Sequence, residues 1–129
     1  MSSLVVVDAA AVVDVLCDLP PGGIVRGILG RATGVAAPAH MDAEVLSALA
    51  RLQRSGGLSD GAARIRALAR FGAARWPIAP VLARAWCLTD RVAARDGLYV
   101  ALAQSLGAPL LTTDTRLRRA ASGLVELAR

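Results

Sequence analysis

Short apolar runs alternate with segments of helical periodicity along this chain, and that alternation constrains the fold more than any other feature. Four runs predict short strands, at 4–7, 34–39, 108–113 and 124–128, and "WPIAP" at 76–80 predicts a further strand or an extended connection. Strands separated by helices are typical of a parallel sheet that is covered on both faces. The sequence therefore predicts an α/β fold with a mainly parallel sheet, in one domain spanning residues 1–129.

The segments between these runs have the periodicity or the end signals of helices. They lie at 9–17, 22–33, 40–57, 60–74, 81–94, 96–107 and 114–121. The segment at 40–57 is the clearest, because Met41, Val45 and Leu49 recur at helical spacing and Gly56 ends the pattern. Ser59 is expected to cap the helix that follows.

Arginine supplies all the basic side chains that stay charged at neutral pH. The chain has 15 arginines, no lysine and 10 acidic residues, so its formal net charge is +5. Codon bias explains the missing lysine, but guanidinium groups bind phosphate in either case, and a basic surface attracts nucleic acid. The lack of lysine excludes a GxxxxGK[ST] phosphate loop and the lysine-dependent phosphoaspartyl families.

The few histidines and cysteines exclude other kinds of site. His40 is the only histidine, so a histidine-rich zinc site is excluded, and no GxSxG motif supports a hydrolase triad. Cys17 and Cys87 form no CxxC pair and are expected as reduced, buried thiols. No apolar run approaches the roughly 18–20 residues of a membrane span, and the first residues lack a basic region. These features predict a cytoplasmic protein with no membrane association.

Four carboxylates follow a common positional pattern. Asp8 and Asp114 come directly after predicted strands, and Glu44 and Asp96 lie at the starts of predicted helices. Each one alone is explained as a helix cap or a first-turn charge. Together they suggest a site, because the carboxyl ends of parallel strands share the edge where binding sites collect in such folds.

A divalent cation would reconcile four acids at one edge. Carboxylates held close together repel one another and resist ionisation. Mg²⁺ or Mn²⁺ prefers oxygen ligands and keeps several waters, so either ion would neutralise the site and admit phosphate. Such a metal polarises a phosphodiester and helps to deprotonate water. The sequence therefore favours an acidic metal pocket on a basic surface.

Three segments, in this order, resemble the PIN-domain ribonucleases, specifically the VapC-type toxins of toxin–antitoxin pairs. They are "VVVDAAAVVDVL" (5–16), "APAHMDAEVLSAL" (37–49) and "RDGLYVALAQSLGAPLLTTDTRL" (95–117). The part from Asp96 to Leu117 is the most specific. Gly97 stands where the family often has alanine, which loosens the helix start by up to ~1 kcal/mol but removes no acid.

The resemblance implies a compact α/β/α sandwich and a metal-dependent endoribonuclease that leaves a 5′-phosphate and a 3′-hydroxyl. Its cofactor would be Mg²⁺ or Mn²⁺. Thr112 matches a position that often carries a hydroxyl near the metal, and Arg116 is well placed for a substrate phosphate. The residues assigned to catalysis and metal binding are Asp8, Glu44, Asp96 and Asp114.

The resemblance also implies three partners: a cognate VapB-type antitoxin, an RNA substrate such as tRNA or rRNA, and a second copy of the chain in a homodimer. The helices expected at 22–33 and within 40–73 would form the antitoxin groove. Two alternatives stay open. One is an inactive PIN-like module that binds RNA or protein, and the other is a metal-dependent nuclease or phosphatase with a different substrate.

Several other charged and aromatic residues have expected places. Asp42 is expected as a cap or first-turn charge, and Asp14 and Asp90 as surface charges within helices. Tyr99 is expected in the core, and Trp76 and Trp86 in the core or at an interface.

A run of arginines is expected on one basic helix, as a solvated face or as a contact for RNA or a partner. Its members are Arg64, Arg66, Arg70 and Arg75.

Overall fold

The computed structural model describes residues 3–129 and contains a four-stranded, fully parallel sheet of order β3-β2-β1-β4. In chain order the elements are β1 (Leu4–Val7), α1 (Ala9–Leu16), α2 (Gly22–Arg31), β2 (Gly34–Pro38), α3 (Met41–Arg54), α4 (Gly61–Ala69), β3 (Ala74–Trp76), a 3₁₀ turn (Ala79–Val81), α5 (Leu82–Trp86), α6 (Ala94–Leu106), β4 (Leu110–Leu111) and α7 (Thr115–Ala121). The predicted parallel α/β architecture is therefore confirmed.

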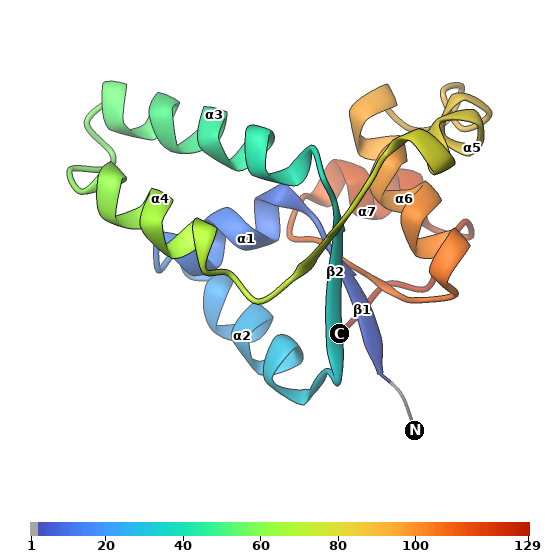
Figure 1. Cartoon of the computed structure of the whole chain (residues 1–129), viewed down its shortest axis with the longest axis horizontal. Helices are drawn as coiled ribbons and strands as arrows, with labels where there is room; N and C mark the ends of the chain where they lie inside the picture. Colours follow the sequence, from blue (N-terminus) through green and yellow to red (C-terminus); the bar gives the residue numbers. More distant parts are fainter. Residues whose placement is uncertain (1–2) are drawn as a thin grey trace.

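The helices form two layers around the sheet. Helices α1 to α4 pack together on one side, and α5 and α6 lie on the other, where α6 contacts β1, β2 and β4 (Figure 1). The valines of β1 are buried from both sides, which explains why this strand is a continuous apolar run. Helix α6 is almost wholly buried from Gly97 to Ala103. Its apolar length therefore places Asp96, at its start, close to the sheet.

The carboxyl ends of β1 and β4 lie side by side. Val6 pairs with Leu110 and Val7 with Leu111, so Asp8 and Thr112 follow the two strands in the same register. On the other flank, β2 pairs with β1 and leads directly into α3. Parallel pairing thus brings residues more than 100 positions apart to one edge of the sheet, as in other α/β folds.

Three expected elements differ in extent. The segment at 124–128 is not a strand: Leu127 forms an isolated parallel bridge to Leu110 of the short strand β4, and Val125 forms another to Ser122. The helix expected at 60–74 ends at Ala69, and residues 74–76 form β3 instead. In the segment at 81–94, where one long helix is expected, a 3₁₀ turn leads into the short helix α5. Tight turns follow α5, such as Leu88 N–H to Ala85 O, and Asp90 lies in this turn and not in a helix.

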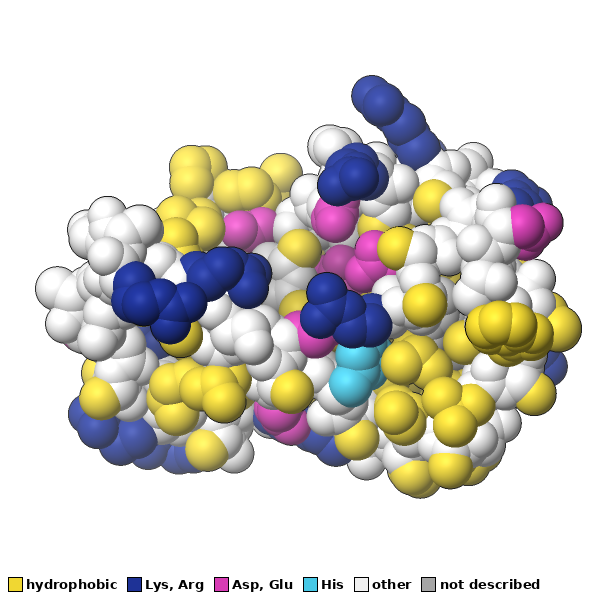
Figure 2. All heavy atoms as spheres, turned by 90° about the horizontal axis from the view of Figure 1, so that it is seen from above, with side chains coloured by type: hydrophobic (Ala, Val, Ile, Leu, Met, Phe, Trp, Pro, Cys, Tyr) yellow, Lys and Arg dark blue, Asp and Glu magenta, His cyan; other side chains and the backbone are white. Residues whose placement is uncertain are grey.

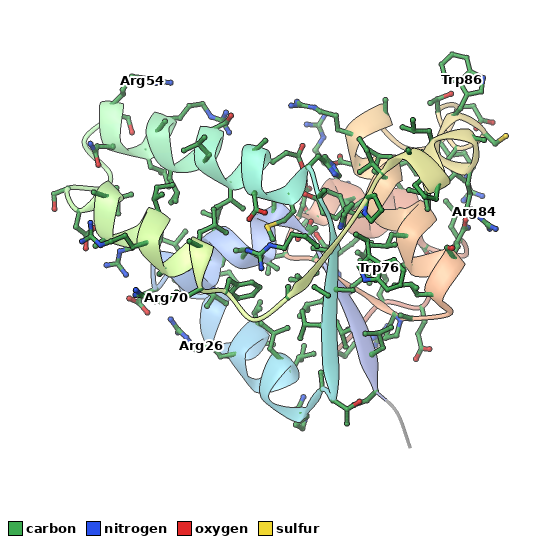
Figure 3. The ribbon with its side chains drawn as sticks, in the orientation of Figure 1. Arg26, Arg54, Arg70, Trp76, Arg84 and Trp86 are labelled. Carbon is green, nitrogen blue, oxygen red and sulfur yellow. The ribbon has the colours of Figure 1, made fainter. Side chains whose placement is uncertain are left out.

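Local predictions about caps and burial are partly wrong. Asp60, not Ser59, occupies the N-cap of α4, and its carboxylate pairs with Arg64. Cys17 is only partly buried, and Cys87 is exposed. Trp76 and Trp86 are 41% and 76% exposed, so neither belongs to the core; Figure 3 shows Trp86 projecting away from α5. Among residues 3–129, no helix has the length and apolar character to cross a membrane.

Candidate acidic site at the carboxyl edge of the sheet

Asp8 is the most buried acid of the site. It follows β1 and caps α1, with its Oδ1 accepting a hydrogen bond from the backbone N–H of Ala11 at 2.9 Å. Its Oδ2 accepts from the hydroxyl of Thr112, which follows β4. Asp8 is only 4% exposed, and it makes no ion pair among the described residues. The cap predicted at this position is present, and the carboxylate is also held away from water.

Thr112 links the two acids that follow strands. Its hydroxyl donates to Asp8 and accepts from the backbone N–H of Asp114 at 3.0 Å. Asp114 in turn caps α7, with Oδ1 accepting from the N–H groups of Arg116 and Leu117 at 2.9 and 3.3 Å. Asp114 Oδ2 is not used in this cap, so one oxygen stays available at the edge.

Glu44 and Asp96 come from the first turns of α3 and α6. Glu44 Oε1 accepts a hydrogen bond from the Tyr99 hydroxyl at 2.6 Å. Its Oε2 lies 3.8 Å from the guanidinium of Arg95, a side chain that is 81% exposed. Asp96 is partly buried beside it.

The four residues Asp8, Glu44, Asp96 and Asp114 are called the edge acids below. Their charges raise the pKa values of Asp8 and Asp96. Burial, and to a smaller degree the charges of Asp114 and Asp96, raise the pKa of Asp8 to about 7, against the lowering effect of its hydrogen bonds. The pKa of Asp96 is also raised, first by burial and then by the charges of Glu44 and Asp114. The fold therefore holds negative charges where the ionised forms are disfavoured.

The edge acids do not form a ready-made metal cage. Within residues 3–129, no three histidine, cysteine or acidic side chains are grouped closely enough to hold a metal ion. The donor set still fits a hard divalent cation, because it consists of carboxylate oxygens and one hydroxyl, and Asp8 has a buried charge without a basic partner. Mg²⁺ usually keeps several waters, which span distances that direct ligation cannot.

The surface around the site is mixed in charge. Figure 2 looks onto this edge and shows acidic side chains gathered near the middle of the face, with arginine groups on more than one side. Arg116 is exposed, two residues after Asp114. Arg118, two residues further on, donates to the backbone carbonyl of Thr112 at 3.3 Å.

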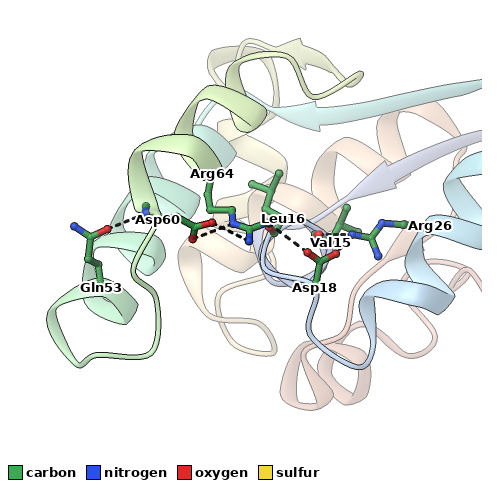
Figure 4. Close-up of polar contacts among 8 residues, drawn as sticks. Val15, Leu16, Asp18, Arg26, Gln53, Asp60 and Arg64 are labelled. Carbon is green, nitrogen blue, oxygen red and sulfur yellow. Dashed lines mark hydrogen bonds and ion pairs between the residues drawn. The ribbon is translucent and has the colours of Figure 1, made fainter.

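The four arginines at 64–75 do not form one basic helix. Only Arg64 and Arg66 lie in α4, and both Arg64 and Arg75 are used inside the fold. Arg64 pairs with Asp60 and Asp18 and donates to the Leu16 carbonyl (Figure 4). Arg66 and Arg70 are exposed.

Asp42 lies in the first turn of α3, as the sequence predicted, and it also pairs with Arg75. Its two carboxylate oxygens accept from Arg75 at 3.0 and 3.1 Å, so it points away from Glu44 and stays outside the site.

Sequence reasoning missed the partners of Glu44. Tyr99 is in the core as predicted, being 1% exposed, but its hydroxyl is part of the site through Glu44. His40 lies beside both residues, with Nε2 at 3.4 Å from Glu44 Oε1. One signal was available: Tyr99 is the only tyrosine and lies in an apolar helix, and a buried tyrosine hydroxyl normally needs an acceptor.

Comparison with known proteins gives consistent matches over most of the chain. The family model described as "PIN domain" matches residues 5–123. Ribonuclease VapC3 of Mycobacterium tuberculosis (strain H37Rv) is 46% identical over 119 residues, covering 90% of this chain and 86% of the relative. Ribonuclease VapC1 of the same strain is 46% identical over 123 residues, covering 92% and 91%.

Solved structures share the fold at lower identity. PAE2754 from Pyrobaculum aerophilum superimposes with a TM-score of 0.70 at 23% identity, over 98% of this chain and 92% of that one. VapC20 of Mycobacterium tuberculosis, described as a sarcin–ricin loop cleaving toxin, gives a TM-score of 0.71 at 16% identity, over 97% and 99%. These likenesses confirm the α/β/α sandwich.

Proposed function

Because this chain belongs to the PIN-domain family and is a relative of the VapC ribonucleases, we propose that it is the toxin of a toxin–antitoxin pair and hydrolyses RNA phosphodiester bonds at the edge acids. The observation that carries the proposal is the state of Asp8. A carboxylate that is 4% exposed, has a pKa of about 7 and is repelled by the charges of Asp114 and Asp96 is unfavourable for folding alone. Perturbed groups of this kind concentrate at functional sites.

The edge acids would hold Mg²⁺ or Mn²⁺, directly or through water. When bound, the ion supplies a Lewis acid for the phosphodiester and lowers the pKa of a water. Asp8 is already oriented for this role, since Ala11 N–H and the Thr112 hydroxyl fix its two oxygens. Thr112 in turn holds the backbone of Asp114. The chain itself therefore contributes preorganised oxygen ligands and needs no covalent nucleophile.

The exposed arginines would bind the substrate backbone around this acidic centre. Arg116 is exposed two residues after Asp114, and Arg95, just before Asp96, places its guanidinium 3.8 Å from Glu44. Guanidinium groups bind phosphate through paired donors and keep their charge at any physiological pH. Aromatic residues make up 3% of the chain, which argues against recognition by base stacking. We therefore expect salt-dependent binding of RNA.

A substrate panel tests the reaction. The purified protein is incubated with single-stranded RNA, structured RNA, DNA and a small phosphodiester, each with Mg²⁺, with Mn²⁺ and with EDTA. We expect cleavage of RNA only, dependent on the divalent ion, with a 5′-phosphate on the product. Cleavage of DNA or of the small ester alone would favour a different phosphohydrolase, and cation-independent cleavage would contradict the metal site.

A binding experiment separates the nuclease from an inactive module. Calorimetric titration with Mn²⁺ should give saturable binding to the wild type and much weaker binding to Asp96→Asn. An RNA-binding chain that takes up no divalent ion and cleaves nothing would favour the module.

The biological partners are tested in cells. Expression of the chain alone should arrest growth, and co-expression of a neighbouring small DNA-binding protein, of the VapB type, should restore it. We also expect a homodimer, which light scattering on the purified chain would test. A chain that leaves growth unaffected while cleaving RNA in vitro would contradict the toxin role but not the nuclease.

A further inference from the structure

Two hydrogen bonds run in opposite directions between the start of α3 and the start of α6. Tyr99, on α6, donates from its hydroxyl to Oε1 of Glu44, on α3, at 2.6 Å. His40, immediately before α3, places Nε2 at 3.0 Å from the backbone carbonyl of Arg95, on α6. Each helix thus contributes one edge acid and one side chain that contacts the other helix, which fixes the acids relative to each other.

The two aromatic side chains also pack against each other. Their ring centroids are 4.7 Å apart with planes inclined at 43°. Because the Arg95 carbonyl only accepts, His40 Nε2 carries the proton of this hydrogen bond, and in the neutral ring Nδ1 is left as an acceptor. Nδ1 is buried and has no hydrogen-bond partner. A histidine ring with an unsatisfied buried nitrogen is unfavourable by itself, so its place here indicates a role in holding its neighbours.

The two carboxylate oxygens of Glu44 have different contacts. Oε1 accepts from Tyr99 and lies 3.4 Å from His40 Nε2. Oε2 has only the exposed Arg95 side chain nearby, at 3.8 Å. A carboxylate oxygen only accepts, so the Tyr99 hydroxyl is the donor of this bond. The result is a carboxylate fixed by one oxygen, whose other oxygen accepts no hydrogen bond among residues 3–129.

We propose that Tyr99 and His40 are positioning residues for Glu44: the Tyr99 hydroxyl holds Oε1, and His40 ties the start of α6 to the start of α3, so that Oε2 is available to a cation shared with Asp96. The inference rests on the proposed metal site and adds residues to it. Neither side chain would touch the ion. Partners that orient metal ligands typically change metal affinity by about 10- to 100-fold when they are removed.

A structural role for Tyr99 makes a different prediction. Tyr99→Phe keeps the ring in the core and removes only the hydroxyl, so a structural role would lower stability and leave metal affinity unchanged. A positioning role lowers metal affinity, and only when Glu44 is a carboxylate. The matched control is Thr89→Val, which removes a hydroxyl that donates to the Trp86 carbonyl, outside the site.

The test is Mn²⁺ binding by electron paramagnetic resonance, on wild type, Tyr99→Phe, Thr89→Val, Glu44→Gln and the double variant Glu44→Gln/Tyr99→Phe. We expect Tyr99→Phe to raise the Mn²⁺ Kd about tenfold, with the control unchanged. At saturating Mn²⁺ the kcat for RNA should return close to the wild-type value. In the Glu44→Gln background, Tyr99→Phe should have no further effect, as a double-mutant cycle requires if it acts through Glu44.

Each other result overturns the inference. An unchanged Kd in Tyr99→Phe, or the same weakening with and without Glu44, would mean that Tyr99 does not position this carboxylate. If Tyr99→Phe does not fold, His40→Phe, which keeps an aromatic ring and removes the bond to Arg95, must weaken Mn²⁺ binding instead. If the wild type binds no Mn²⁺, the proposed function itself fails. The titration of the wild type distinguishes that outcome from failure of the positioning role alone.

Discussion

Two regions of the molecule combine acids and arginines in opposite ways. At the carboxyl edge, Asp8 is buried without a basic partner, and Arg95 is exposed beside Glu44. Around the ends of α1 and α4, the acids are matched by arginines that also bind backbone carbonyls. This second region, called the arginine-capped ends, consists of Arg26, Arg64 and Arg75 with Asp18, Asp42 and Asp60.

Arg75 shows how complete this matching is. Its guanidinium donates to both oxygens of Asp42 and to the carbonyls of Leu68, Phe71 and Ala73, which uses all five of its donors. Arg64 and Arg26 also bind carbonyls at the end of α1. The Leu16 carbonyl accepts from Arg64 and the Val15 carbonyl from Arg26, each at 2.7 Å (Figure 4). Here charge stabilises helix ends. Among residues 3–129, the edge acids have no arginine partner that is bound in this way.

This difference separates the charges that stabilise the fold, at the arginine-capped ends, from those of the proposed site, at the edge acids. The fold supplies arginines to its helix ends and leaves Asp8 without a basic partner, which is the pattern expected if the edge binds a cation, as proposed. Substitutions at the edge should therefore affect activity more than stability, and substitutions at the arginine-capped ends should do the reverse. The four predictions below test this contrast, from the largest expected effect to the smallest.

Asp96→Asn should have the largest effect. Removing an edge acid should lower RNA cleavage by more than about a hundredfold, beyond the loss expected for a residue that only orients a ligand. Stability should stay the same or rise slightly, because the raised pKa of Asp96 means that the fold disfavours its charge. Cleavage assays and urea denaturation measure the two effects. Asp90→Asn, at an exposed turn, is the control, and equal cleavage by Asp96→Asn and wild type would remove Asp96 from the site.

Asp8→Asn should change how stability depends on pH in EDTA. The folded pKa of about 7 lies above the ordinary 3.8, so the folded state binds the proton more tightly. Wild-type stability relative to Asp8→Asn should therefore fall as the pH rises from about 4 to about 7, by up to ~4 kcal/mol. Urea denaturation at several pH values measures this difference. A difference that does not change with pH would show that Asp8 ionises normally in the fold.

Arg75→Met should lower the free energy of unfolding by about 2 kcal/mol, because it leaves Asp42 and three carbonyls without their donor. At a temperature where the variant is folded, its kcat for RNA should equal that of the wild type. Denaturation and cleavage assays on the same preparation test both parts. Loss of cleavage in a fully folded variant would contradict the assignment of Arg75 to the fold.

Arg64→Met should have the smallest effect, a drop in Tm that is less than that of Arg75→Met. The ion pairs of Arg64 with Asp18 and Asp60 are at the surface and are screened by salt. The difference in Tm from wild type should therefore shrink as NaCl is raised, and cleavage should not change. A Tm loss as large as that of Arg75→Met, and insensitive to salt, would mean that the hydrogen bond from Arg64 to the Leu16 carbonyl supplies most of the stabilisation by this arginine.

Much of the fold could be predicted because it depends on neighbours in the sequence. The apolar run of β1, the helical spacing of Met41, Val45 and Leu49, and the caps at Asp8 and Asp114 are all decided within a few residues. The extent of α4 and α5 could not be predicted in this way. Helix α4 ends where Arg75, from the next strand, binds its last carbonyls, and the segment after α5 forms tight turns closed by its own backbone.

The sequence by itself determined the alternation of strands and helices, and with it the sheet edge at which Asp8 and Asp114 follow neighbouring strands, because periodicity and capping are local properties. Only the tertiary structure decided which acid is buried without a partner, that Arg75 belongs to Asp42, and that Tyr99 belongs to Glu44. Those pairs join residues 33 and 55 positions apart. The physical reason is that burial and charge pairing depend on which distant segments pack together, and local pattern does not contain that information.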